Sequence, residues 1–518
     1  MKAFLMYKDQ DFNLEREMPP NEQTLTQDLA LDTLFESMAL GDKFLFEVAR
    51  QSIFSSLNDP DSILYRQNIL KDCLKNSFIV RDIYNIAIES IEKRKEHWWG
   101  FSSRYPSSIL YSSVEALKML VGQLRKLKSI AGEHAHRFES EGFARFFAML
   151  ENELDDEYFA RVVEHLGELK FRKGVLISAG LGKGNKPFNF VLHKPSDKRQ
   201  SWLRRILGQR TQVCTFRLHP RDENGAKALS DLKDRGLNLV ADALAQSAEH
   251  VLSFFRMLRT ELAFYIGCLN LNGQLVRKEE PTCFPEPAAF GERKHSCRGL
   301  YDLCLALNMT QRVVGSDVNA DRRDLVIITG ANQGGKSTFL RSVGLAQLMM
   351  QAGMFVAAES FCSDVCDRIF THYRREEDTT MKSGKLDEEL SRMNDIADNV
   401  SSNSMILFNE SFSATNEREG SEIAGQITSA LVEKGVKVFF VTHLYEFAHS
   451  QYSRKMGNAV FLRAERTPDG ARTFKLIEGE PLLTSFGEDL YSRVFNEYSS
   501  DSHLAAEGGH ARGQVFSG

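Results

Sequence analysis

Apolar residues in the first half of the chain recur at the spacing of α-helices. One such stretch runs from Asp28 to Phe54, and a turn at residues 58–61 separates it from a second stretch that ends at Leu74. Residues three or four apart share one face of a helix, so these stripes are typical of helices that bury one side in a core. The pattern predicts a mainly α-helical first half. Further stretches of this kind cover residues 79–97, 109–130, 138–154 and 226–271.

The second half alternates short apolar runs with helical patterns. Runs of β-strand type cover Leu325–Thr329, Met405–Phe408 and Val436–Thr442. Strands that are separated by helical crossovers imply a mostly parallel sheet with helices on both of its faces. This half of the chain is therefore predicted to be an α/β domain.

The length of 518 residues is too large for one hydrophobic core, which predicts at least two domains. A proline-rich stretch, Pro281–Pro287, marks the expected boundary. The predicted fold class is multidomain, with a mainly α-helical region over residues 1–275 followed by an α/β domain over residues 285–497. The polar, glycine-containing tail over residues 498–518 is expected to be disordered.

A glycine-rich loop follows the first predicted strand of the α/β domain directly. Gly330, Gly335, Lys336 and Ser337 satisfy the pattern G-x-x-x-x-G-K-[ST] of a phosphate-binding loop, or P-loop. A chance glycine-rich turn is the alternative, but the strand before the loop and the apolar helix pattern after it argue against that. The lysine can reach the β- and γ-phosphates of a nucleotide, and the serine hydroxyl can ligate Mg²⁺. We therefore expect ATP and Mg²⁺ as cofactors. The expected nucleotide-binding residues are Gly330, Ala331, Asn332, Gln333, Gly334, Gly335, Lys336, Ser337 and Thr338.

A second apolar strand ends in the polar pair Asn409 and Glu410, where a Walker B motif is expected. In that motif an acidic residue holds the water shell of the metal, and the next glutamate orients or activates the attacking water. Glu410 fits the second role, whereas Asn409 stands where aspartate is usual. The lost charge removes roughly a few kcal/mol of attraction for a divalent ion, so we expect slow or conditional hydrolysis. The alternative for Glu410 is a surface acid at a strand end.

His443 follows the strand predicted over residues 438–442. A histidine at this tip can hydrogen-bond the γ-phosphate and report its presence. The alternative is a polar residue that is satisfied locally, and the P-loop upstream favours the first interpretation. Lys336, Glu410 and His443 are therefore the candidate catalytic residues, and Ser337 and Asn409 the candidate metal ligands.

The segment from about residue 180 to residue 221 is strongly basic and contains two predicted strands, over residues 188–193 and 213–218. Lys and Arg side chains neutralise phosphates and release counterions, so this segment is the best candidate for a nucleic-acid surface. A solvated face or an intramolecular docking patch remains the alternative. The candidate DNA-binding residues are Lys198, Arg199, Arg204, Arg205 and Arg210.

Composition narrows the choice of compartment and partner. The formal net charge of −5 excludes a global attraction to nucleic acid, so DNA binding must use a local patch. The eight cysteines are scattered, which favours reduced structural thiols. No apolar run approaches the roughly 18 residues of a membrane span, and the amino-terminal sequence does not fit a signal peptide. We expect a cytoplasmic protein without a membrane partner.

From Arg323 to about Phe495 the chain resembles the ATPase domain of the MutS family, the DNA mismatch-repair ATPases related to ABC proteins. The order and spacing of several segments carry this resemblance. They cover residues 327–338, 367–371, 377–378, 407–415, 441–443 and 484–490. The stretch Leu29–Leu74 resembles, more weakly, the start of the helical core and lever region of the family.

The resemblance implies a homodimer with composite ATP sites. One subunit supplies the P-loop, Glu410 and His443, and the other supplies a signature loop, expected near residues 383–387. Leu386 takes the place of the usual serine there, so Ser383 or Lys385 is left as the donor, and a plain amphipathic helix start is the alternative. Residues 413–416 lie where relatives cross the dimer interface, and Arg312 lies where they tend to place an aromatic side chain.

The resemblance also implies a function. The family's mismatch-finding members carry an amino-terminal domain with a Phe-x-Glu wedge, and no such domain is recognised in this sequence. We expect a short MutS-like ATPase that closes as a dimeric clamp on mismatched or branched DNA in repair or recombination. The alternative is a nucleotide-gated binding module with little turnover that acts on RNA, a ribosome or a protein partner. A transporter ATPase is disfavoured because a long helical region precedes the ATPase on the same chain.

Overall fold

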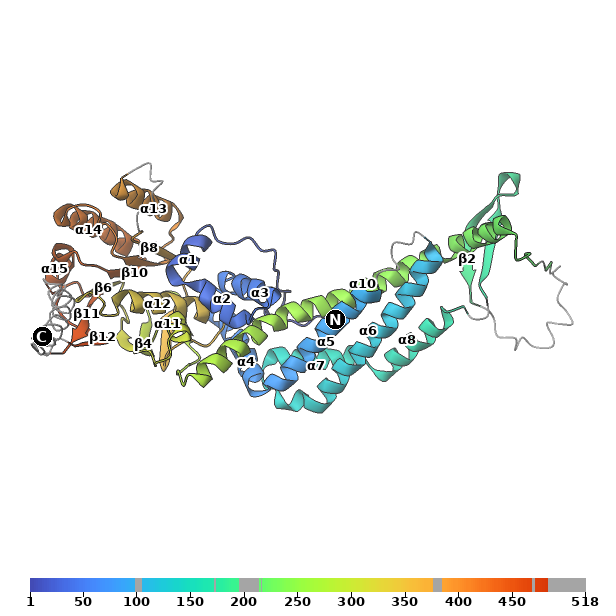
Figure 1. The fold of residues 1–518 in the computed structure, drawn as a ribbon, viewed down its shortest axis with the longest axis horizontal. Helices are drawn as coiled ribbons and strands as arrows, with labels where there is room; N and C mark the ends of the chain where they lie inside the picture. Colours follow the sequence, from blue (N-terminus) through green and yellow to red (C-terminus); the bar gives the residue numbers. More distant parts are fainter. Residues whose placement is uncertain are drawn as a thin grey trace, which may run out of the picture. The chain divides into compact units, whose positions relative to one another are not determined.

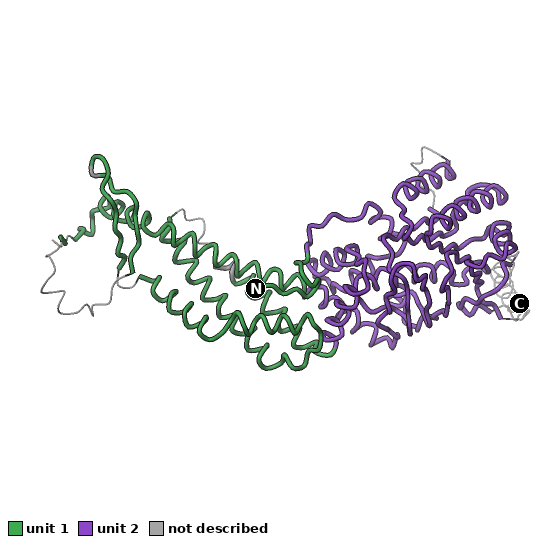
Figure 2. Tube along the Cα trace, turned by 180° about the vertical axis from the view of Figure 1, so that it is seen from behind, with its two compact units in different colours: residues 1–12, 75–262 green, residues 13–74, 263–518 purple. Residues whose placement is uncertain are grey.

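The computed structural model describes residues 1–97, 105–171, 174–194, 214–215, 217–375, 384–467 and 471–482. The chain forms two compact units, shown in different colours in Figure 2. Unit 1 comprises residues 1–12 and 75–262, and unit 2 comprises residues 13–74 and 263–518. The units divide the chain within two helices rather than at Pro281–Pro287, and the domain limits drawn from the sequence stay predictions.

Unit 1 consists of long helices and one β-hairpin. Its helices are α5 (Ser77–His97), α6 (Pro106–His134), α7 (Glu141–Glu153), α8 (Asp156–Glu168), the 3₁₀ turns η2 (Ala135–Arg137) and η3 (Lys183–Asn185), and most of α10 (Glu223–Arg277). Helices α7 and α8 begin where the side chains of Ser140 and Asp155 accept a backbone N–H of the first turn. Leu110 and Val114 of α6 pack with Leu237 of α10 in a buried cluster, as the helical spacing predicts.

The β-hairpin of unit 1 joins β1 (Leu176–Leu181) to β2 (Pro187–His193) in antiparallel pairing. Strand β2 was predicted, but its partner was not. The strand predicted over Val213–Leu218 is wrong for its described residues 214, 215, 217 and 218, which form no strand. Because β2 pairs with the segment before it, the later alternating segment has no described neighbour to complete a hydrogen-bond ladder.

Unit 2 begins with helices that pack against its α/β part. They are α1 (Glu22–Leu29), α2 (Leu31–Ala39), α3 (Lys43–Phe54) and all but the last residue of α4 (Pro60–Lys75). The single helical stretch expected from Asp28 to Phe54 is interrupted because Ala30 and Leu40 adopt left-handed backbone angles, with φ of 54° and 49°. The guanidinium of Arg66 is fully buried and donates to the carbonyl oxygen of Ala352 over 3.0 Å.

The six-stranded sheet of unit 2 has the strand order β12-β11-β6-β10-β9-β8. Its strands are β6 (Leu325–Thr329), β8 (Ile369–Tyr373), β9 (Met405–Asn409), β10 (Lys437–Val441), β11 (Ala459–Arg466) and β12 (Arg472–Glu478). All neighbours are parallel except β11 and β12, which confirms the mostly parallel sheet expected from the sequence. The carboxyl ends of β6, β8, β9 and β10 therefore meet at one edge, where loops can build a site.

Helices cover both faces of this sheet. In Figure 1, α13 (Lys385–Asn399), α14 (Glu417–Glu433) and α15 (Tyr445–Ser453) lie on one side and α12 (Lys336–Gln351) on the other. Successive strand residues point to opposite faces, so Ile406 and Phe408 join the cluster under α14, whereas Leu407 approaches Gly344 of α12. Burial on both faces explains why β6, β9 and β10 are almost purely apolar.

A second, four-stranded sheet was not predicted. It has the order β3-β7-β4-β5, formed by β3 (Glu286–Ala288), β7 (Ser360–Asp364), β4 (His295–Leu300) and β5 (Ser316–Asn319), with α11 (Leu303–Asn308) between β4 and β5. All eight cysteines are free thiols. Among the helices of the described part of the chain, none is long and apolar enough to cross a bilayer.

Candidate nucleotide-binding site

The glycine-rich loop joins β6 to α12 at the carboxyl edge of the six-stranded sheet. Gly330 and Gly335 have φ of 109° and 89°, in the left-handed region that glycine adopts without strain. A Cβ atom on Gly330 would lie 2.9 Å from the backbone nitrogen of Ala464, so the position has no room for a side chain. Helix α12 begins at Lys336 without a side-chain cap, which leaves the N–H groups of its first turn for an anion.

Lys336 is buried and its ammonium group is held by the loop itself. Its Nζ donates to the carbonyl oxygens of Gly330 over 2.9 Å and Ala331 over 3.0 Å. Burial lowers the pKa of this amine to about 8, although Glu410 opposes the shift. The positive charge therefore sits inside the loop, next to the space that the loop encloses.

Ser337 and Asn409 bring two oxygen atoms together beside the start of α12. The Ser337 hydroxyl donates to the Asn409 Oδ1 over 2.9 Å, and Asn409 is the last residue of β9. Oxygen donors of this kind suit Mg²⁺, which keeps several waters and takes few protein ligands. No cluster of three or more His, Cys, Asp or Glu side chains within the described ranges could hold a metal by itself. The residues present thus fit a Mg²⁺ that is shared with bound phosphates, with no negative charge from Asn409.

Glu410 and His443 meet at the ends of neighbouring strands. The Nε2 of His443 lies 3.0 Å from Oε1 of Glu410, and both side chains are partly exposed. The hydrogen bond from His443 is the main cause that holds the pKa of Glu410 below its ordinary value, and the charges of Lys336 and Arg374 add to it. Glu410 has φ of 55°, a strained angle for a non-glycine residue, and its backbone N–H donates to Val441 over 2.9 Å. The carboxylate is therefore ionised and held in a fixed direction at this edge.

Two pockets flank the start of α12. One, of about 420 Å³, is lined by Ser337, Asn409 and three arginines: Arg341, Arg374 and Arg375. The other, of about 340 Å³, is mostly apolar, and its walls include Phe339 and Phe474. Phosphates bind among positively charged side chains, whereas a flat base binds among apolar ones. The two pockets offer these two environments next to the start of α12.

The apolar pocket contains one expected residue and one that the sequence did not reveal. Arg312 lines it, as its place in the chain suggested, and lies 3.9 Å from the carboxylate of Glu280. Phe474 is 51% exposed and belongs to β12. Arg472, the first residue of the same strand, donates to Gln333 of the glycine-rich loop over 3.0 Å. No local signal marks Phe474, because only the β11–β12 hairpin brings it to this loop.

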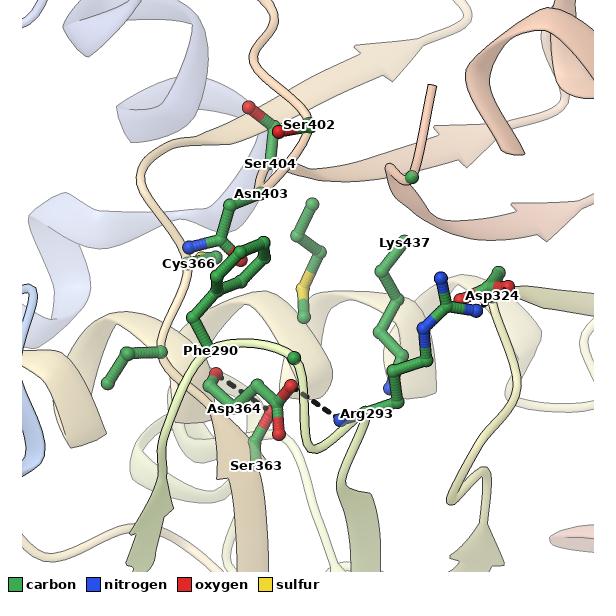
Figure 3. Close-up of a pocket in the computed structure, with 14 residues that line it drawn as sticks. Phe290, Arg293, Asp324, Ser363, Asp364, Cys366, Ser402, Asn403, Ser404 and Lys437 are labelled. Carbon is green, nitrogen blue, oxygen red and sulfur yellow. Dashed lines mark hydrogen bonds and ion pairs between the residues drawn. The ribbon is translucent and has the colours of Figure 1, made fainter. Parts of the chain in front are cut away.

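A third pocket, of about 170 Å³, lies at the opposite edge of the sheet, where β6, β8, β9 and β10 begin (Figure 3). The carboxylate of Asp364 accepts the backbone N–H groups of Arg293 over 2.7 Å and Lys294 over 2.8 Å. Lys437 lines the same pocket, and burial lowers its pKa to about 8. This pocket shares no lining residue with the two beside α12.

The structure describes only some of the remaining predicted site residues. Lys198, Arg199, Arg204, Arg205 and Arg210 lie outside the described residues, as do Ser383 and the segments 377–378 and 484–490. Gly384 is the residue before α13, and Lys385, Leu386 and Asp387 form its first turn, as the helix-start alternative predicts. The DNA surface and the donor from the second subunit stay predictions.

Comparisons with known proteins match both halves of the chain. The family model of the MutS2 N-terminal domain matches residues 58–278, and that of MutS domain V matches residues 326–492. The DNA mismatch repair protein MutS of Thermotoga petrophila is 34% identical over 172 residues, which are 33% of this chain and 22% of that protein. The protein of the same name from Chlorobium chlorochromatii is 29% identical over 235 residues, 43% of this chain and 26% of that protein.

A third relative bears a different name. Endonuclease MutS2 of Thermus thermophilus is 33% identical over 156 residues, which are 30% of this chain and 20% of that protein. This chain therefore covers between 20% and 26% of the length of these three relatives.

Proposed function

Because this chain belongs to the MutS family, we propose that it is an ATPase that binds DNA and acts in DNA repair or recombination. The observation that carries the proposal is the convergence of five side chains at the carboxyl edge of the six-stranded sheet. Lys336 and Ser337 follow β6, Asn409 and Glu410 end β9, and His443 follows β10. Lys336, Ser337, Glu410 and His443 are types that phosphoryl transfer to water uses at these positions, and Asn409 occupies the place of the usual aspartate.

ATP binding starts with the glycine-rich loop. Its backbone N–H groups and the first turn of α12 receive the phosphates, and Lys336 exchanges its two carbonyl contacts for phosphate oxygens. Ser337 and Asn409 would hold a Mg²⁺ ion together with water, and this ion would supply positive charge to the phosphates. The base lies in the apolar pocket, where Phe474 stacks on one of its faces.

Hydrolysis requires a water molecule held in line with the terminal phosphate. Glu410 is ionised, and its Oε1 is engaged by His443, which leaves Oε2 to accept a proton from that water. The strained backbone at Glu410 fixes the direction of the carboxylate. His443 holds Glu410 in place and contacts the terminal phosphate when it is present.

DNA binding is assigned to the basic segment near residues 180–221. Lys183 and Lys186 are exposed on the hairpin of unit 1, and Lys198, Arg199, Arg204, Arg205 and Arg210 extend the positive charge along the sequence. In this proposal two copies form a clamp through their ATPase domains. Changing Arg204 and Arg205 together to glutamate weakens DNA binding and lowers its salt dependence. An unchanged salt dependence would place the DNA elsewhere.

The experiment that tests the main proposal is steady-state ATP turnover by the purified protein. It is measured without DNA, with homoduplex DNA and with a four-way junction, against the Lys336→Ala variant as background. Turnover above that background that rises with DNA supports a DNA-coupled ATPase, and a larger rise with the junction identifies branched DNA as the preferred substrate.

A second function is favoured by one observation, the uncharged Asn409 beside the metal position. The protein would then be a nucleotide-gated binding module that turns over little and holds RNA, a ribosome or another protein. Turnover at background in every condition, together with measurable ATP binding, supports this alternative.

A further inference from the structure

Arg374 lies next to the metal position of the proposed ATP site. It follows β8, and its backbone N–H donates to the carbonyl oxygen of Asn409 over 2.9 Å. Strands β8 and β9 pair in parallel with Tyr373 opposite Asn409, so the next residue after β8 is fixed at the carboxyl edge. The backbone position of Arg374 is therefore set by the sheet, although residues 376–383 are not described.

The pocket that Arg374 lines also contains the two candidate metal ligands. Its volume is about 420 Å³, and Ser337, Thr338 and Asn409 are among the residues that line it. Two of its arginines are already paired: Arg341 with the buried carboxylate of Asp302, and Arg375 with Asp28 over 3.4 Å. Within the described part of the chain, the guanidinium of Arg374 has no hydrogen bond or ion pair, and the residue is exposed.

An aspartate at position 409 would place a carboxylate in the pocket that Arg374 also lines. The asparagine at this position gives Arg374 no such partner. The charge of the Arg374 guanidinium is therefore available to a ligand. A guanidinium offers paired N–H donors that match two oxygens of one phosphate group.

We propose that Arg374 binds the terminal phosphate of the nucleoside triphosphate and neutralises charge that a divalent ion would otherwise neutralise alone. The proposal rests on the ATP site described above. It predicts a site that distinguishes triphosphate from diphosphate even when Mg²⁺ is removed, because the discriminating cation belongs to the protein.

The test is equilibrium binding of ATP and ADP to the full chain, each in Mg²⁺ and in excess EDTA. In EDTA the unaltered protein binds ATP more tightly than ADP. Arg374→Ala weakens ATP binding by about 10- to 100-fold in EDTA, leaves ADP binding nearly unchanged, and loses less affinity in Mg²⁺. Arg374→Lys retains part of the preference, since a point charge replaces the paired donors.

The control is Arg454→Ala, which removes an exposed arginine at the end of α15 and leaves both affinities unchanged. Equal losses for ATP and ADP in Arg374→Ala, or no loss, would overturn the role of Arg374 while leaving the ATP site intact. A protein that binds neither nucleotide in Mg²⁺ would overturn the proposed function itself, and with it this inference.

Discussion

The Ser337 hydroxyl donates to the side-chain oxygen of Asn409 over 2.9 Å, so the P-loop helix and β9 meet through two uncharged groups. Neither of these two groups offers a divalent ion the negative charge of a carboxylate. In the proposed ATP site we therefore expect weak retention of the metal, whereas the glycine-rich loop carries every residue of its motif.

Asn409→Asp is expected to lower the Mg²⁺ concentration for half-maximal ATP turnover by about tenfold, because a carboxylate attracts the ion that an amide cannot. Turnover is measured against Mg²⁺ concentration at saturating ATP. Asn13→Asp adds the same charge in an exposed turn before α1 and serves as the control. An unchanged or weaker Mg²⁺ response would mean that the amide is required by the chemistry of this site.

Glu410→Gln is expected to bind ATP normally and to lose turnover by at least about 100-fold, because an amide cannot accept the proton of the attacking water. ATP binding and phosphate release are measured on the same preparation. Glu446→Gln, an exposed position in the first turn of α15, keeps normal turnover. Normal hydrolysis by Glu410→Gln would remove Glu410 from the mechanism.

Local sequence patterns were sufficient for the centre of this site. The order strand, glycine-rich loop and helix at β6 and α12 is contiguous, and β9 and β10 are continuous apolar runs that read as buried strands. Lys336, Ser337, Asn409, Glu410 and His443 were placed correctly relative to these elements because each lies within two residues of a strand or helix end.

The periphery of the site depends on pairing between distant segments, which a local pattern does not encode. Arg374 reaches the metal position because β8 lies beside β9, and Phe474 reaches the P-loop through the β11–β12 hairpin. The four-stranded sheet was not predicted for the same reason. Its short strands pair with segments that are distant in the sequence, as His295 does with Ser363. The predicted strand Val213–Leu218, which is wrong for its described residues, is the converse case: an alternating pattern with no described partner.

Lys336 predicts a pH dependence of ATP binding. Burial lowers its pKa to about 8, so the amine of the empty site is charged below that pH and neutral above it. ATP affinity should be insensitive to this group below about pH 8 and fall by up to about tenfold per pH unit above it. Binding measured between about pH 7 and about pH 9.5 checks this. Lys336→Arg stays charged throughout, and any affinity that it retains should show no such fall. If the ATP affinity of the unaltered protein did not change over this pH range, Lys336 would not be a buried amine that loses its proton near pH 8.

Phe474→Ala is expected to weaken ATP binding by about three- to tenfold through loss of stacking on the base. Binding of inorganic triphosphate should not change, because it has no base to stack. The two ligands are compared by competition on one protein sample. Phe290→Ala removes a similarly exposed phenylalanine from the pocket at the opposite edge and should affect neither ligand. Equal losses for both ligands would show that Phe474 supports the loop instead of the base.

Glu261 predicts a pH dependence of stability in unit 1. It lies on α10, is fully buried, and its Oε2 accepts the backbone N–H of Leu5 over 2.7 Å. Burial raises the pKa of this carboxyl to about 7, against the backbone hydrogen bonds that favour the charged form. The folded state thus binds the proton more tightly than the unfolded chain. The stabilisation is complete below about pH 4.5 and is lost as the pH rises through 7.

Glu261→Gln keeps the shape of this side chain and removes its ionisation, so the variant should gain on the order of 2 kcal/mol of unfolding free energy above pH 7 relative to the unaltered protein. Near pH 4.5 the two proteins should be equally stable. Urea unfolding followed by circular dichroism at each pH gives the unfolding free energies of the two proteins. Glu249→Gln makes the same change at a half-exposed position of α10 and should show no such difference between the two pH values. A variant that is less stable than the unaltered protein above pH 7 would mean that the backbone hydrogen bonds to the carboxylate outweigh the cost of its burial.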